Sequence, residues 1–202
     1  MTIEVPRDEV KRYFLLANKG KGFFKERKLS RRELEDAYFN ALLNFNKLEE
    51  CQLDKLFRDK VRLQRYNEMS WYKTTDAFSE MGPWPKMKGL DIRLTTGNIL
   101  ETADGIRIVR QEKSNLYVPE KFWAKLDSLE ENLDFIYPNF PLVLFPGGEV
   151  REKDYNTWAR ENSEPLCRIF KYDIDDGNNR AVAYALSRFN EASVFVGVRN
   201  DN

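Results

Sequence analysis

Apolar residues at helical spacing dominate the first third of the chain. Val10 and Phe14 lie one turn apart, which predicts a short helix over residues 7–18. Ser30 and Glu33 have the spacing of a capping box, so a second helix is expected to begin there. One apolar stripe runs along this second helix, in steps of four, three, four and three residues. The stripe consists of Leu34, Tyr38, Ala41, Phe45 and Leu48.

The apolar pattern then changes phase. Leu53 and Val61 continue it out of register with the stripe, so either a turn lies near residues 49–52 or one long helix continues with a displaced seam. Both alternatives predict a helical N-terminal third. It ends before residues 82–85, where two prolines fix the backbone and forbid a helix.

Alternating apolar and polar residues follow this boundary. Residues 90–94 have the pattern of one strand and residues 99–102 that of a second. The dipeptide Asp104-Gly105 is a turn signal that precedes a third apolar run over residues 106–109. The pattern predicts a three-stranded antiparallel meander.

Helices and strands alternate in the second half of the chain. A helix is expected between Pro119 and Pro138, because Pro119 suits a first turn and Pro138 cannot continue the helix. The elements expected beyond it are a strand at 142–145, a polar helix at 152–161, a strand at 166–174, a helix at 179–189 and a strand at 192–198. The last two strands either lie parallel as neighbours in a right-handed crossover or run antiparallel.

These elements predict an α+β fold. A helical N-terminal part, about residues 7–80, would be followed by a mostly antiparallel sheet with packed helices. We expect one compact domain over residues 1–202, because its 42% hydrophobic residues suffice for a core. A subdivision into a helical part, 1–81, and an α+β part, 86–202, stays open. With 14 Phe, 9 Tyr and 4 Trp, large rings are expected to build the core and to supply a contact surface.

The chain contains no histidine, which removes the usual general base and metal ligand. Its two cysteines, Cys51 and Cys167, are too far apart in sequence for a C-x-x-C motif. We therefore expect free thiols, no disulfide, and no bound metal or cofactor. The first residues are charged and no apolar run is long enough to cross a bilayer, so a cytoplasmic location without membrane contact is expected.

Charge is unevenly distributed although the net charge of the chain is zero. Residues 1–32 hold ten Lys or Arg against four Asp or Glu, a local net charge of +6. One hypothesis is that basic and aromatic side chains here contact a partner, either phosphates or an acidic protein surface. The alternative is a solvated loop with both phenylalanines in the core. The candidate residues are Lys19, Lys21, Phe23, Phe24, Lys25, Arg27, Lys28, Arg31 and Arg32.

A second candidate site is acidic. Glu101 and Asp104 flank the predicted hairpin turn, and Gln111-Glu112-Lys113 closes the following strand, so two carboxylates and a lysine would converge at one sheet edge. This arrangement resembles the PD-(D/E)xK nuclease core, and the resemblance implies magnesium-dependent phosphodiester cleavage. The sequence departs from that core in lacking the Pro-Asp dipeptide and in carrying Gln111 at the second acidic position.

Three aspartates, Asp173, Asp175 and Asp176, precede Gly177 and are expected to cap the following helix. No serine nucleophile motif is present. The sequence therefore predicts a non-enzymatic macromolecular-interaction protein, an adaptor, inhibitor or assembly subunit, whose partner is another protein or complex. Nucleic-acid binding through the basic segment and the nuclease are the alternatives.

Overall fold

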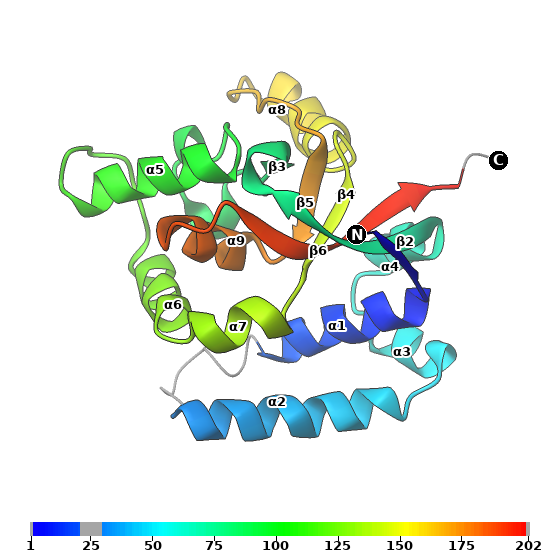
Figure 1. The fold of residues 1–202 in the computed structure, drawn as a ribbon. Coiled ribbons are helices and arrows are strands. Elements are labelled where there is room, and N and C mark those ends of the chain that lie inside the picture. The colour runs from blue at the N-terminus through cyan, green and yellow to red at the C-terminus, as the bar shows by residue number, and fades with distance from the viewer. Residues whose placement is uncertain (1, 21–29, 201–202) are drawn as a thin grey trace.

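A six-stranded mixed sheet forms the centre of the molecule (Figure 1). The computed structural model describes residues 2–20 and 30–200, with the backbone alone for residues 19 and 20. The strands within these ranges are β1 (Ile3–Val5), β2 (Met69–Ala77), β3 (Met81–Gly82), β4 (Leu142–Pro146), β5 (Tyr172–Asp176) and β6 (Glu191–Arg199).

Helices surround this sheet. The α-helices are α1 (Arg7–Gly20), α2 (Arg31–Asn46), α3 (Glu50–Leu56), α4 (Lys60–Asn67), α5 (Ile99–Arg110), α6 (Glu120–Glu130), α7 (Leu133–Asn139), α8 (Thr157–Glu161) and α9 (Asn178–Leu186). Short 3-10 helices are η1 (Phe78–Glu80), η2 (Met87–Gly89) and η3 (Ile92–Leu94), and a π-helical turn is η4 (Arg151–Asn156). No helix of the described ranges is both long and apolar enough to cross a membrane.

The strand order is β1-β2-β6-β4-β5-β3. Three neighbouring pairs are antiparallel, whereas β4 with β6 and β3 with β5 are parallel. The fold is thus α+β, as the sequence predicts, with a mixed sheet. Strands β5 and β6 are separated by β4 and run in opposite directions, so the helix between them does not connect parallel neighbours.

Helix α1 lies between the sheet and α2 (Figure 1). The ring of Tyr13 on α1 contacts that of Phe195 on β6, with centroids 5.2 Å apart. The predicted capping box begins α2, because Ser30 accepts from the Glu33 amide and Glu33 accepts from the Ser30 amide. Of the predicted stripe, all but the last member is buried, at Leu34, Tyr38, Ala41 and Phe45.

Large rings build the core, as expected from the composition. Tyr66 on α4 is fully buried and its ring centroid lies 4.9 Å from that of Trp71 and 5.4 Å from that of Phe14. The Trp71 indole N–H donates to the Tyr66 carbonyl at 3.1 Å, so this buried polar group has a partner. Helix α1, helix α4 and strand β2 are joined by these contacts.

The N-terminal part is not helical throughout. Residues 69–77 form β2, which pairs along its whole length with β6, from Met69 opposite Arg199 to Ala77 opposite Glu191. The predicted helical range of 7–80 is therefore wrong over these residues, whose aromatic and β-branched side chains favour a strand. Of the two alternatives near residues 49–52, the turn is confirmed, since α2 ends at Asn46 and α3 begins at Glu50.

The predicted three-stranded meander is also wrong. Residues 99–110 form helix α5, which begins with a capping box between Asn98 and Glu101. Gly105 lies inside the helix rather than in a turn, and a Cβ there would lie 2.9 Å from a methyl carbon of Leu94. Glycine serves close packing of α5 on η3 at this position, and sequence alone cannot distinguish that use from a turn.

Two further boundaries differ. The single helix expected between Pro119 and Pro138 is two helices, α6 and α7, interrupted at Glu131 and Asn132. The strand expected at 166–174 is shorter and begins later in the chain, as β5 (Tyr172–Asp176).

Cys51 is exposed, Cys167 is buried, and no disulfide joins them.

Candidate ligand-binding cavity

The predicted basic and aromatic site lies largely outside the described residues. Lys21, Phe23, Phe24, Lys25, Arg27 and Lys28 fall in residues 21–29, and of Lys19 only the backbone is described. Of the candidate residues, the structure describes the side chains of Arg31 and Arg32, which lie at the start of α2. Arg32 is exposed.

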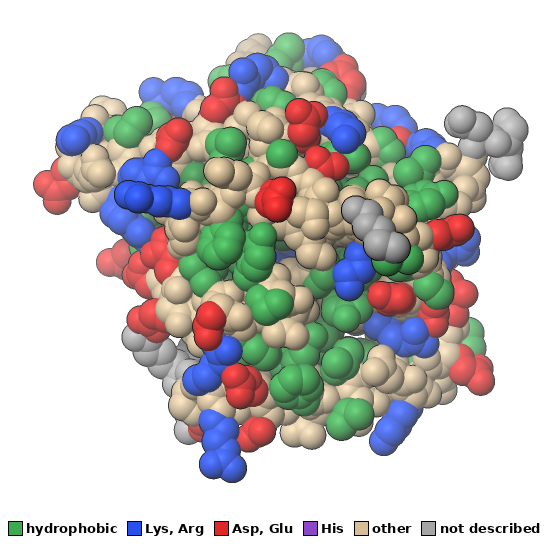
Figure 2. Space-filling view, viewed as in Figure 1, with side chains coloured by type: hydrophobic (Ala, Val, Ile, Leu, Met, Phe, Trp, Pro, Cys, Tyr) green, Lys and Arg blue, Asp and Glu red, His purple; other side chains and the backbone are tan. Residues whose placement is uncertain are grey.

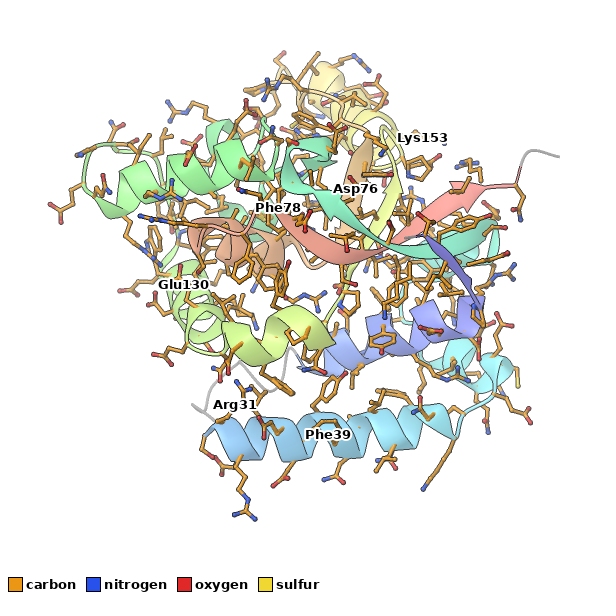
Figure 3. The ribbon with its side chains drawn as sticks, in the orientation of Figure 1. Arg31, Phe39, Asp76, Phe78, Glu130 and Lys153 are labelled. Atoms are coloured by element: carbon orange, nitrogen blue, oxygen red, sulfur yellow. The ribbon has the colours of Figure 1, made fainter. Side chains whose placement is uncertain are left out.

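Arg31 is engaged within the fold. Its guanidinium pairs with Glu35 on the same helix and with Asp134 on α7, the latter at 2.6 Å, and lies 4.8 Å above the centre of the Phe135 ring. Figure 3 shows Arg31 between the start of α2 and α7. Lys11, also counted in the basic N-terminal stretch, is fully buried against Glu50 and Asp54. Part of the positive charge of residues 1–32 is therefore taken up by ion pairs within the fold.

The predicted acidic site does not form. Glu101 and Asp104 lie on α5 and not at a sheet edge, because the hairpin that was to bring them together is a helix. Glu101 caps its own helix and pairs with Arg168, while Asp104 pairs with Arg107. Within the described ranges no three Cys, Asp or Glu side chains are grouped to hold a metal ion.

A cavity of about 260 Å³ lies where β5 ends and α9 begins. Strand β3 runs parallel to β5, so its carboxyl end, followed by Trp84, lies at the same edge of the sheet. Crevices at the carboxyl ends of strands are common ligand sites in sheet proteins. The lining residues are Ala17, Arg62, Trp84, Met87, Lys88, Lys125, Leu129, Ile136, Phe140 and residues 175–180.

Asp175 anchors the polar wall of the cavity. One of its carboxylate oxygens accepts from Arg62 Nε and the other from the Tyr66 hydroxyl, both at 2.9 Å. The next residue, Asp176, accepts from Arg180 at 2.7 Å. The two aspartates thus hold two arginines from different helices, α4 and α9, against the end of β5.

Burial governs the ionisation of this wall. Removal from water raises the pKa of Asp175 to about 6, against the opposing effect of Arg62. Burial alone would lower the pKa of Arg62, but the negative charges around it, Asp175 first, outweigh burial and raise it. Burial also raises the pKa of Tyr66 well above its usual value. At neutral pH the pair is a carboxylate and a guanidinium, with Tyr66 as a neutral donor.

The capping role expected of the three aspartates is wrong for two of them. Asp173 accepts from the backbone amides of Val150 and Arg151, and Asp175 binds side chains of α4. The residue that begins α9 is Gly177, with φ of 102°. A Cβ there would lie 2.6 Å from Leu142, so this left-handed position requires glycine on grounds of both conformation and space.

A buried arginine holds the segment that forms the opposite wall. Arg151 on η4 is fully buried, and its guanidinium donates to the carbonyls of Pro83, Thr95 and Thr96 at 2.8–3.1 Å. Burial lowers its pKa. The segment it secures, residues 83–97, supplies Trp84, Met87 and Lys88 to the cavity.

Two residues of this segment, Lys86 and Lys88, have a left-handed backbone, with φ of 53° and 52°. Non-glycine residues adopt this conformation at an energetic cost, and such strain tends to collect at functional sites. The side chain of Lys88 is exposed at the cavity. One signal in the sequence points to this site: a strand that ends in Asp-Asp-Gly directly before a helix, which is the arrangement of a strand-end crevice.

A second surface feature lies on α2. Phe39 and Leu43, one turn apart, are 52% and 60% exposed. Figure 2 shows hydrophobic side chains gathered over the region of α1 and α2, and Figure 3 labels Phe39. Exposed rings are thus present, as expected from the composition, but nothing in the described structure indicates what covers them.

Comparison with known proteins adds no relative: the chain matches no protein-family model, no curated protein and no solved structure. The class that the fold and the cavity define is an α+β protein with a charged and apolar cavity at the strand ends of a mixed sheet.

Proposed function

We propose that this protein binds a small organic ligand in the cavity between β5, α9, α6 and the segment 83–89. The observation that carries the proposal is the composition of the wall, in which paired charges and apolar side chains line the same cavity. Ligand sites are typically concave and largely apolar, with a few placed polar groups. The buried Asp175, which accepts hydrogen bonds from Arg62 and Tyr66, supports the same assignment.

The test is ligand-observed NMR against a mixture of one-ring and short-chain compounds: phenylacetate, phenylacetamide, phenethylamine and hexanoate. The discriminating variant is Ala17→Leu, which adds bulk at the cavity from a half-buried helical position. The matched control is Ala124→Leu, the same change on the exposed side of α6. We expect binding to the natural chain and to the control, and loss of binding in Ala17→Leu. Binding that survives Ala17→Leu, or no binding at all, rejects the proposal.

A second candidate function is the macromolecular interaction predicted from the sequence. Its support is the local net charge of +6 over residues 1–32. Four of the cations, Lys21, Lys25, Arg27 and Lys28, are close in sequence to Phe23 and Phe24 and lie outside the described residues. The partner would be an acidic protein surface or nucleic acid. Because Lys11, Arg12 and Arg31 have partners within the fold, the proposal rests on the remaining cations of residues 1–32.

Fluorescence anisotropy against labelled single-stranded DNA, duplex DNA and RNA, at low and moderate salt, tests the nucleic-acid version. The variant reverses two charges, Arg27→Glu and Lys28→Glu, and the control reverses one on α6, Lys121→Glu. Salt-sensitive binding that is lost only in the double variant supports it. Absence of binding at low salt rejects nucleic acid as the partner. Affinity capture with the same double variant and control then tests for a protein partner.

A further inference from the structure

Each charged side chain of the cavity wall has a partner. These side chains are Arg62, Lys88, Lys125, Asp175, Asp176 and Arg180. Arg62 donates to Asp175 at 2.9 Å. Arg180 donates to Asp176 at 2.7 Å. The two lysines also take part in interactions within the protein. A charged ligand group would lose its hydration on entering, and no charge of the described lining residues is left over to compensate that loss. The wall therefore favours an uncharged ligand.

The two arginines nevertheless keep hydrogen-bond donors for a ligand. A guanidinium carries five N–H groups, and each arginine uses one nitrogen to bind its aspartate. Among the described residues, no acceptor binds the two terminal amino groups of Arg62 or the Nε and Nη1 atoms of Arg180. Because none of these nitrogens is buried without a partner, each has surface that a ligand can reach. Both side chains line the cavity, so the wall offers donors in excess of its own acceptors.

The aspartates determine which acceptor these donors can bind. An anionic group bound to Arg62 would lie next to the carboxylate of Asp175. The same group bound to Arg180 would lie next to that of Asp176. Two negative charges on one guanidinium repel each other, whereas a carbonyl oxygen accepts hydrogen bonds without carrying a net charge. A cationic group offers only donors, which an arginine cannot accept. An uncharged carbonyl group therefore fits this wall better than an anion or a cation.

Apolar side chains beside these donors suit the body of the ligand. The guanidinium carbon of Arg180 lies 5.6 Å from the centre of the Phe140 ring, and both residues line the cavity. The apolar lining residues that are at most 4% exposed are Met87, Leu129, Ile136 and Phe140. A cavity of about 150 Å³ accepts benzene. The volume of about 260 Å³ found here thus accommodates one ring or a short chain with a small polar group.

We infer that the ligand is an uncharged carbonyl compound, an amide or a ketone carried on one ring or a short aliphatic chain. Its carbonyl oxygen accepts hydrogen bonds from Arg62 and Arg180, and its body packs on the apolar wall beside Phe140. This inference rests on the proposed function, since it names the chemistry of the ligand of the same cavity.

The test is isothermal titration at neutral pH with probes that share one body and differ in their polar group. Phenylacetamide and phenylacetone carry an uncharged carbonyl, phenylacetate is an anion, phenethylamine is a cation, and toluene has no polar group. We expect at least one of the two uncharged carbonyl compounds to bind at least about tenfold more tightly than phenylacetate and than toluene, and the amine not to bind.

Variants of the aspartates test why the anion is disfavoured. Asp175→Asn removes the negative charge beside Arg62, so phenylacetate should bind about tenfold more tightly while the affinity for phenylacetamide stays within about twofold. Asp176→Asn should act in the same direction through Arg180. A variant that only disturbs the wall would weaken both probes. The matched control is Asp104→Asn, which removes an aspartate that pairs with Arg107 on α5, outside the cavity. It should change neither affinity.

A double variant tests the donors. Arg62→Gln combined with Asp175→Asn removes the guanidinium and its carboxylate together, so no buried charge is left without a partner. We expect phenylacetamide to bind about tenfold more weakly. Arg107→Gln combined with Asp104→Asn removes an exposed pair in the same way and should have no effect. Far-UV circular dichroism of each variant checks that it is folded.

The outcomes separate the two proposals. If phenylacetate binds the natural chain as tightly as the uncharged carbonyl compounds, or if neither aspartate variant strengthens its binding, the inference about the carbonyl group is wrong. The proposed function then still stands, provided that binding is lost in Ala17→Leu. If none of the probes binds, the proposed function fails together with the inference.

Discussion

Asp175 is the residue at which burial and charge conflict most strongly. It is 7% exposed and accepts two hydrogen bonds from α4, yet burial raises its pKa to about 6, above the usual value of 3.8 for an aspartate. A carboxylate whose pKa is raised on folding binds its proton more tightly in the folded state. Its contribution to stability is therefore most favourable at low pH and is lost as pH rises through the window from 3.8 to about 6.

The substitution Asp175→Asn removes this titration while keeping an oxygen acceptor. Two pKa units correspond to about 3 kcal/mol, so the free energy of unfolding of the natural chain relative to the variant should fall by up to about 3 kcal/mol between pH 4 and pH 7. Urea denaturation at a series of pH values measures it.

A control of opposite sign is available in Asp91. The hydrogen bond from Arg93 lowers the pKa of Asp91, so its contribution is present at neutral pH and is lost as pH falls. The relative stability of the natural chain against Asp91→Asn should therefore rise with pH. A difference between the natural chain and Asp175→Asn that is flat from pH 4 to pH 7 would contradict the buried state of Asp175.

At the scale of elements, the π-helical turn η4 and the segment 83–97 depend on one side chain. Gly82 approaches Arg151 so closely that a Cβ at residue 82 would lie 2.6 Å from Nη1. The guanidinium satisfies carbonyls that no regular strand or helix pairs, which allows an irregular segment to be buried. The cavity wall is thus positioned by a residue that does not line it.

Arg151→Met keeps an unbranched side chain that replaces the aliphatic stem of the arginine, and it removes every donor. Each buried carbonyl left without a donor costs about 1–3 kcal/mol, and the expected total loss of stability is about 3–5 kcal/mol. Arg151→Lys should lose less, because an ammonium still reaches some of the carbonyls. Urea denaturation measures both.

The control is Arg160→Met on α8, where the side chain is 51% exposed and pairs with Glu152. Exposed pairs contribute at most about 1 kcal/mol, so this variant should be close to the natural chain. If Arg151 also positions the cavity wall, Arg151→Lys, measured under conditions in which it is folded, binds phenylacetamide more weakly. Equal stability of Arg151→Met and Arg160→Met would show that the buried contacts are not needed.

At the scale of the whole molecule, the sheet crosses the boundary that the sequence indicates at residues 82–85. Strands β1, β2 and β3 come from one side of it and β4, β5 and β6 from the other, and β2 lies directly beside β6. Helix α1 covers Phe195 of β6. The two sides therefore share one sheet and one core.

A fragment of residues 84–202 would keep β4 beside β6, but it would leave β6 without its other neighbour, β2, and Phe195 without the cover of α1. We predict that this fragment is unfolded by far-UV circular dichroism and that the full chain unfolds in one transition, with coincident circular dichroism and tryptophan fluorescence. The fragment of residues 1–83 serves as the control. If each fragment is unfolded because the other is missing, mixing the two fragments should restore the circular dichroism of the full chain. Cooperative unfolding of fragment 84–202 alone would show two independent domains.

Local signals in the sequence determined a good part of this protein. The capping box at Ser30 and the buried stripe through Tyr38 follow from contacts within one or two helical turns, and they are confirmed. The α+β class follows from the same alternation of patterns, and it is confirmed as well. Such features can be predicted from the sequence because the residues that determine them are near neighbours along the chain.

Tertiary structure decided the rest, including the cavity. Gly105 is a helix residue because Leu94 packs against it, and β2 is a strand because β6 lies beside it, and neither neighbour is close in sequence. Asp175 meets Arg62 across 113 positions and Lys125 reaches the same space from a third element. A pattern along the chain identifies which side chains are charged or apolar, but only the folded sheet brings the end of β5, α4 and α6 around one volume, because their contacts are all long-range.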